Sequence, residues 1–219
     1  MLLFLRPSRL HAGETNGDYI KEALAGGKGG ADVPEISDED DDDDSASVGA
    51  VDDEGAMALA VEATRKFLLD NPDATPAAVA ELVTNQQMAS ALKSQEKVHI
   101  LVRAALTPNF FKEKEIPKYS KSFAAVTNGN RIMERHLISA LEHMCVDKPK
   151  NFPVALKQMY DEDALDEEAI LEWADEGRSE YTLEAVDEET RAILRGQAEP
   201  VVVWLQEADS EDDSSSGEE

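Results

Sequence analysis

The chain has 219 residues, of which 47 are acidic and 21 basic, giving a formal net charge of −26. This charge argues against direct binding to nucleic acids or to anionic membranes, because both need clustered lysines and arginines. It favours basic proteins as partners. The single cysteine excludes an internal disulfide and fits a reducing compartment, so we expect a cytoplasmic protein. No apolar run reaches the roughly 18 residues of a membrane span, and no membrane association is expected.

The charge is unevenly distributed along the chain. Residues 31–55 carry a net charge of −12, residues 56–160 carry +4, and residues 161–219 carry −19. We therefore expect three parts: a disordered Gly-rich and acidic linker over residues 1–55, a helical domain over residues 56–209, and an acidic Ser-rich tail over residues 210–219. Neither end can bury enough apolar surface to offset the entropy of an ordered chain.

From residue 56 onward, apolar side chains recur with a period near 3.6, which predicts helices. The clearest start signal is Thr75 followed by Pro76, an N-cap with proline at the first helical position. The expected stops are Asn71-Pro72, Thr107-Pro108 and Asn128-Gly129. We expect helices over about residues 56–70, 76–83, 89–106, 120–126, 131–144, 154–160, 163–176, 182–194 or 187–194, and 198–208.

These helices fall into candidate pairs that begin near residues 56, 90, 130 and 163, with a last helix near residue 198. The spacing of roughly 35–40 residues per pair is that of an α-solenoid repeat. We therefore predict an all-α fold of stacked antiparallel helix pairs, with an acidic last pair, in a monomer.

Two stretches near the C-terminus each combine a single tryptophan with acidic residues. Box one (residues 166–176) has Ile170, Trp173 and Ala174 at helical spacing, and box two (residues 198–209) has Val201, Trp204, Leu205 and Ala208. This spacing predicts a buried tryptophan under a rim of carboxylates.

The carboxylates of the two boxes have no basic partners in their own segments. Their mutual repulsion would be relieved by a basic ligand, which favours a docking surface over a reaction centre. The candidate partner-binding residues are Asp166, Glu167, Glu168, Glu172, Trp173, Asp175 and Glu176 in box one, and Glu199, Trp204, Glu207 and Asp209 in box two.

Other charged and hydroxyl residues form weaker candidates. A second, basic surface for acidic partners is suggested by Lys112, Lys114, Lys118, Lys121, Arg131 and Arg135, although ordinary solvated lysines explain the pattern as well. Ser37, Ser210, Ser215 and Ser216 each precede an acid at the third position and are candidate phosphorylation sites for an acidophilic kinase.

The sequence gives no sign of an enzyme, a metal site or a cofactor site. His136 and His143 lie near Cys145 but lack metal-ligand spacing. Lys28 is followed by Gly29, where a phosphate loop requires Ser or Thr. No pair of carboxylates stands out as a general acid and base. We expect no catalysis, no metal and no cofactor.

The two boxes resemble those of the eukaryotic translation initiation factor 5 family. The resemblance rests on Lys157-Gln158-Met159-Tyr160-Asp161 followed by Leu165 to Trp173, and on Ala198-Glu199-Pro200, Trp204-Leu205 and Glu207-Ala208-Asp209 before an acidic Ser-rich end. It covers about residues 56–210 and implies a HEAT-like domain.

The resemblance also implies partners and a role. They are the lysine-rich segment of the beta subunit of initiation factor 2, the c subunit of initiation factor 3, and initiation factor 1. The implied role is assembly of the preinitiation complex, together with restraint of GDP release from factor 2. The carboxylates would recognise lysines, and the tryptophans would hold the helices in place.

The chain departs from that family in one large way. The family's N-terminal half stimulates GTP hydrolysis and carries a four-cysteine zinc finger, whereas this chain has only Cys145. We therefore expect no GTPase-activating activity. The alternatives are a factor 5-mimic protein, the epsilon subunit of the exchange factor for factor 2, which a nucleotide-release assay would separate, and an acidic chaperone of basic proteins.

Overall fold

The computed structural model describes residues 53–213, with side chains described as far as residue 207. Residues 1–52 of the predicted linker, including Ser37, and the serines at 215 and 216 therefore lie outside the described residues, as do the side chains of Asp209 and Ser210. The last three residues of the predicted linker belong to the first helix. The described elements are α1 (Asp53–Asp70), α2 (Pro76–Ala89), α3 (Glu96–Ala105), α4 (Phe110–Glu113), α5 (Glu115–Thr127), α6 (Arg131–Cys145), η1 (Pro149–Asn151), α7 (Phe152–Asp161), α8 (Glu167–Asp175) and α9 (Glu188–Asp213).

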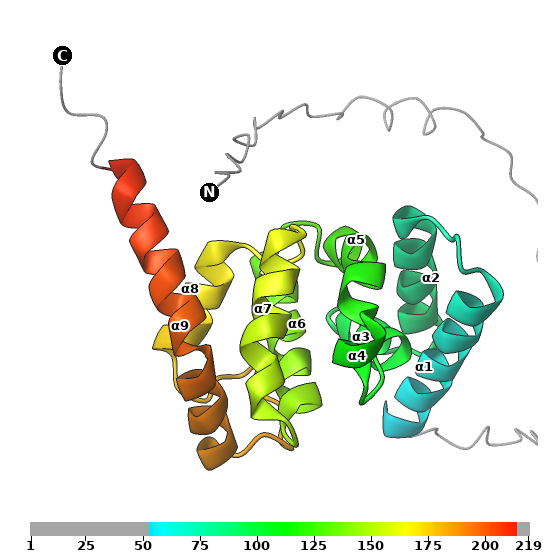
Figure 1. The fold of residues 1–219 in the computed structure, drawn as a ribbon. Helices are drawn as coiled ribbons and strands as arrows, with labels where there is room; N and C mark the ends of the chain where they lie inside the picture. The colour runs from blue at the N-terminus through cyan, green and yellow to red at the C-terminus, as the bar shows by residue number, and fades with distance from the viewer. Residues whose placement is uncertain (1–52, 214–219) are drawn as a thin grey trace, which may run out of the picture. The chain divides into compact units, whose positions relative to one another are not determined.

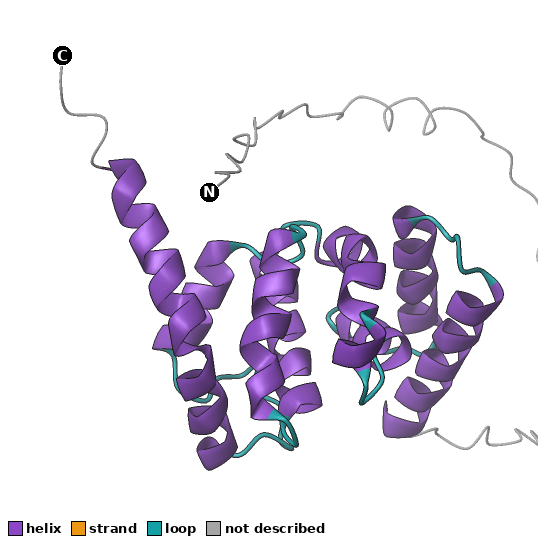
Figure 2. Ribbon diagram, in the orientation of Figure 1, coloured by secondary structure: helices purple, strands orange, loops and turns teal. Residues whose placement is uncertain are grey.

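The described helices form two layers of stacked antiparallel pairs (Figure 1). The pairs are α1 with α2, α3 with α5, α6 with α7, and α8 with α9. One layer contains α1, α3, α6 and α8 in that order, and the other contains α2, α5, α7 and α9, with neighbours in contact throughout. No strand is present between residues 53 and 213 (Figure 2). The predicted all-α, HEAT-like fold is confirmed.

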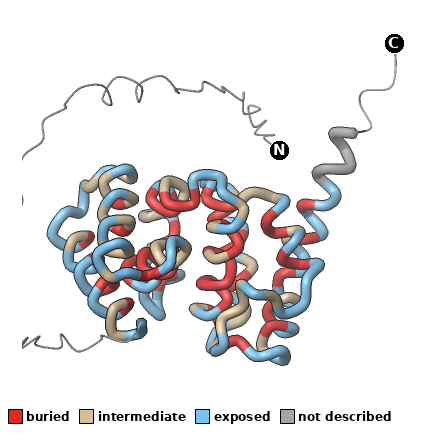
Figure 3. The backbone as a smooth tube through the Cα atoms, turned by 180° about the vertical axis from the view of Figure 1, so that it is seen from behind, coloured by how far each residue is buried: buried red, intermediate tan, exposed pale blue. Residues whose placement is uncertain are grey.

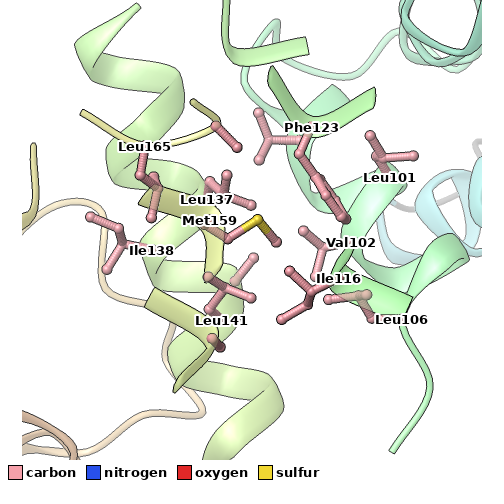
Figure 4. Packing of buried hydrophobic residues seen from close by; sticks show 14 of the residues in the cluster. Leu101, Val102, Leu106, Ile116, Phe123, Leu137, Ile138, Leu141, Met159 and Leu165 are labelled. Carbon is pink, nitrogen blue, oxygen red and sulfur yellow. The ribbon is translucent and has the colours of Figure 1, made fainter. Parts of the chain in front are cut away.

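The core runs between the two layers (Figure 3). At its centre, Leu101 of α3 and Phe123 of α5 face Leu137 of α6 and Met159 of α7 (Figure 4). These four side chains are at most 1% exposed. Burying a large apolar side chain contributes about 1.5–3 kcal/mol, so the stability of each pair depends on the pair beside it.

Several predicted helix boundaries follow from side-chain chemistry that the structure confirms. The Thr75 hydroxyl accepts a hydrogen bond from the Ala78 amide (3.2 Å) at the start of α2. The side-chain Oδ1 of Asn130 likewise accepts a hydrogen bond from the Met133 amide (3.1 Å) at the start of α6. Asn128, with a φ of 49°, ends α5. Each of these groups satisfies a backbone donor or reverses the chain where the helix must begin or end.

Other boundaries differ from the prediction. The helix expected from about residue 89 begins only at Glu96, because α2 continues to Ala89 and the chain then turns through Ala91, which has a φ of 52°. The helix expected from residue 163 begins at Glu167. The helix expected at 120–126 already starts at Glu115, and the four-residue helix α4 was not predicted.

The largest difference lies at the C-terminal end, where two predicted helices are one. Helix α9 runs from Glu188 to Asp213 and contains Pro200. Proline removes one backbone hydrogen bond, and its ring crowds the carbonyl four residues earlier, which here is that of Gly196. A continuous buried stripe of Leu194, Ala198, Val202 and Leu205 keeps the helix in place across this point.

None of the helices in the described part of the chain is long and apolar enough to span a membrane.

Candidate functional site

Helix α8 carries box one and has two distinct faces. Ala169, Ile170, Trp173 and Ala174 are buried, as the apolar spacing predicts. Glu168, Glu172, Asp175 and Glu176 are exposed on the other side, one to two turns apart. Asp166 and Glu167 are half-buried at the start of the helix, where the buried carboxylate of Glu134 accepts a hydrogen bond from the Asp166 amide (3.1 Å). The exposed acids therefore form one rim along α8.

Trp173 is fixed by contacts from three helices. It is 3% exposed, and its indole Nε1 donates to Glu142 Oε1 of α6 (2.9 Å). The Phe152 ring of α7 meets the indole edge to face, with centroids 5.2 Å apart. Arg191 of α9 lies over the indole (5.4 Å) and donates to the Trp173 carbonyl (2.8 Å). Trp173 therefore joins α6, α7 and α9 to α8.

Glu142 and Arg191 form a buried pair beside this tryptophan. Their side chains are 2% and 6% exposed, with Arg191 Nε 3.6 Å from Glu142 Oε1. Burial raises the pKa of Glu142, while the Trp173 hydrogen bond and Arg191 act in the opposite direction. A buried carboxylate with this environment is a structural partner for the indole, and the sequence pattern did not reveal it.

The carboxylate rim of box one is neutralised in part by two arginines of α6. Arg131 donates to Glu168 and to Glu172. Arg135, one turn later, donates to Glu172 (3.4 Å) and to Glu176 (3.3 Å to Oε1). The two helices thus form a ladder in which arginines and glutamates alternate. Two expectations are corrected: the box-one acids do have basic partners within the protein, and Arg131 and Arg135 do not belong to a separate basic surface.

The two arginines differ in burial. The Arg135 side chain is 4% exposed and its guanidinium lies 4.8 Å from the centre of the Tyr181 ring. Burial opposes its charge, but hydrogen bonds to Glu176 and the charges of Glu176 and Glu172 raise its pKa overall. The hydrogen bond from Arg135 in turn lowers the pKa of Glu176. Arg131, by contrast, is 39% exposed.

The segment between α8 and α9 covers one side of Arg135. The Tyr181 ring contacts both Arg135 and His136, and the His136 and Tyr181 rings meet edge to face at 5.2 Å. His136 Nδ1 is 3.2 Å from Nε2 of the buried His99 of α3. An open hollow of about 610 Å³ lies over this region, lined by Arg135, Glu172, Glu176 and residues 177–181. No pattern in the sequence pointed to Tyr181, because its partners Arg135 and His136 lie 45 or more residues earlier.

Box two has a different geometry, because Trp204 is on the surface. The indole is 41% exposed, although the apolar spacing predicted a buried ring. It meets the Tyr160 ring edge to face (5.7 Å), and Lys157 Nζ lies 4.8 Å from its centre. Both partners come from α7. The buried face of α9 is formed instead by Ala198, Val202 and Leu205, so the predicted stripe was rotated by part of a turn.

The acids of box two are more widely spaced than those of box one. Glu199 pairs with Arg195 one turn earlier on the same helix. Glu207 is exposed, and the side chain of Asp209 lies beyond those described. Lys112 of α4, Lys118 and Lys121 of α5, and Lys114 between these two helices are all exposed, and Lys118 lies over the Tyr119 ring (4.7 Å).

Within the described residues, no cluster of three or more histidine, cysteine or carboxylate side chains has the arrangement of a metal site. Cys145 is fully buried, and burial raises the pKa of its thiol to about 12. A thiol in that environment is not a nucleophile at neutral pH.

Comparisons with known proteins agree with this architecture. Residues 133–215 match the family W2: eIF4-gamma/eIF5/eIF2-epsilon. The chain is 37% identical over 113 residues to eukaryotic translation initiation factor 5 of Pongo abelii, and 34% identical over 128 residues to that of Phaseolus vulgaris. These matches cover 48% and 55% of this chain but only 25% and 26% of the relatives, so the chain spans about a quarter of their length.

A solved structure described as the C-terminal domain of translation initiation factor 5 at low pH has the same fold, with a TM-score of 0.53 and 20% identity. The match covers 72% of this chain and 96% of the solved structure. Residues 133–215 therefore match the W2 family, and the helical part of the chain is similar in sequence to initiation factor 5 and in fold to the C-terminal domain of that factor.

Proposed function

We propose that the protein is a non-catalytic binding module of translation initiation that works in the cytoplasm. Its acidic boxes bind the lysine-rich segment of the beta subunit of initiation factor 2. The same domain contacts the c subunit of initiation factor 3 and initiation factor 1, and so assembles the preinitiation complex. The matches to initiation factor 5 support this role.

The single observation that carries the proposal is the cation-binding rim of α8. Glu168, Glu172 and Glu176 already bind the guanidinium groups of two arginines. Exposed Asp175 adds a further carboxylate to the same rim. A partner that supplies several lysines would meet a surface whose geometry accepts cations, and long-range attraction would raise its association rate.

The direct test is calorimetric titration of the chain with a lysine-rich peptide at two salt concentrations. We expect binding that weakens with salt and that is abolished when Glu167, Glu168 and Glu172 are changed together to Lys. A matched control changes Asp70, Asp73 and Glu81 to Lys; these exposed acids of α1, α2 and their connection give the same change in net charge.

Because Glu172 also holds the buried Arg135, a milder pair keeps the test independent of folding. Glu168→Gln with Asp175→Asn removes two exposed charges and leaves both partners of Arg135 in place. Folding is checked by circular dichroism. Equal affinity of the wild type and this pair, with the triple variant folded and still binding, would refute the proposal.

The family description also names the exchange-factor subunit eIF2-epsilon, so the effect on GDP needs its own assay. We infer that the chain slows GDP release from initiation factor 2 rather than accelerating it. Release of labelled GDP from factor 2 would be followed with and without the chain. Acceleration would favour an exchange-factor role.

A further inference from the structure

Arg131 occupies the carboxylates to which a basic partner would bind. It is the first residue of α6, and it bridges Glu168 and Glu172, which lie one turn apart on α8. A positive charge at a helix N-terminus is opposed by the helix dipole, so its own helix does not stabilise it there. Arg131 is held there by its attraction to the carboxylates of Glu168 and Glu172.

The exposure of this contact makes it exchangeable. The side chains of Arg131, Glu168 and Glu172 are 39%, 74% and 47% exposed. Ion pairs at such exposure contribute little to stability, because water and salt screen them. Arg135 is the opposite case, because it is 4% exposed and lies against Tyr181. The same ladder therefore has one fixed arginine and one replaceable arginine.

The space around Arg131 suits an incoming lysine. A shallow hollow of about 320 Å³ is lined by Arg131, Glu168, Leu171, Glu172 and Asp175. A lysine could lay its methylene stem on the half-buried Leu171 and place its ammonium between the carboxylates. Arg131 and such a lysine would compete for the same oxygens.

We propose that Arg131 is a built-in competitor for the basic partner, which occupies box one in the free protein and is displaced on binding. This inference rests on the proposed function and adds its regulation. A single lysine would only exchange one cation for another, whereas a run of lysines gains contacts along the rim while displacing one arginine. Arg131 therefore lowers the affinity for isolated cations and favours a lysine-rich segment.

The test measures binding of the lysine-rich peptide to Arg131→Gln. Losing the competitor should tighten binding by about two- to fivefold, which lies within the range of one exposed ion pair. Lys66→Gln is the matched control, since it removes one exposed positive charge from α1, at the other end of the row of helix pairs (Figure 1). It should change the affinity by less than twofold.

A second measurement follows the arginine side chains directly by NMR. On addition of the peptide, the Arg131 Nε–H signal should move and the Arg135 signal should stay. Equal affinities of Arg131→Gln and Lys66→Gln, or weaker binding by Arg131→Gln, would overturn the inference while leaving the proposed function standing. Peptide that binds neither the wild type nor Arg131→Gln would overturn both. Peptide that binds only the Arg131→Gln variant would support the inference strongly.

Discussion

The two acidic boxes look alike in sequence but differ in structure. In box one the tryptophan is buried and the acids bind arginines from the neighbouring helix α6. In box two the tryptophan is exposed, and a lysine of α7 lies on its ring. The difference comes from position: α8 packs against both α6 and α9, whereas α9 is the last helix of the described chain and has no further helix beside it. The same residue types therefore hold α8 against its neighbours and remain accessible on α9, the other helix of the same pair.

The sharpest test of this comparison is Trp173→Ala. Replacing a buried tryptophan by alanine costs about 3–5 kcal/mol, and here it also removes the donor to the buried carboxylate of Glu142. Because small domains are stable by only about 5–15 kcal/mol, we expect a large drop in the urea midpoint, measured by circular dichroism. Trp173→Phe should lose less, because it retains a ring against Phe152. A midpoint close to that of the wild type would show that Trp173 does not hold these helices together.

The second prediction concerns the pH dependence of stability, which should come in part from His99 and His136. Burial, followed by the charges of His136, Arg103 and His143, lowers the pKa of His99 from 6.5 to about 4. Burial also lowers the pKa of His136, whose ring meets Tyr181 edge to face; Tyr181 in turn contacts Arg135. The unfolded chain thus takes up protons at a higher pH than the folded chain, and stability rises with pH between 4 and 6.5.

The contribution of His99 can be isolated by substitution. Acidification from pH 8 to pH 5 should cost about 2 kcal/mol through this residue. His99→Gln should lose that part of the pH dependence, measured by urea unfolding at both values. The raised pKa of Glu142 works in the opposite sense, since protonation favours its buried form. An unchanged pH dependence in a folded His99→Gln variant would show that the histidine pair does not sense acid.

The sequence predicted the parts of the fold that local chemistry decides. The Thr75-Pro76 start, the Asn128-Gly129 stop and the buried face of α8 all depend on residues within one or two turns. The position of Trp204 could not be derived in this way. Residues 201–205 are apolar at every position, so both Val201-Trp204-Leu205 and Ala198-Val202-Leu205 have helical spacing. Contact with α7 and α8 selects the second stripe.

The contacts of box one likewise could not be derived from local sequence patterns. Arg131 and Arg135 precede their partners by 37 to 41 residues, and the sequence alone placed them with the lysines of the basic stretch. Their role depends on α6 and α8 lying side by side in one layer. Glu142 also looks like a surface residue in a helical pattern, yet it is 2% exposed because Trp173 and Arg191 meet there.

The smallest expected effect completes the comparison. Trp204→Ala removes an edge-to-face contact with Tyr160 and a cation–π contact with Lys157, which together are worth about 1–2 kcal/mol at an exposed site. The urea midpoint should therefore fall by less than half as much as in Trp173→Ala. Trp204→Phe is the control, because phenylalanine keeps a ring for both contacts. An equal drop in the urea midpoint for Trp204→Ala and Trp173→Ala would contradict this prediction. It would mean that the exposed Trp204 stabilises the α8–α9 pair as much as the buried Trp173 does.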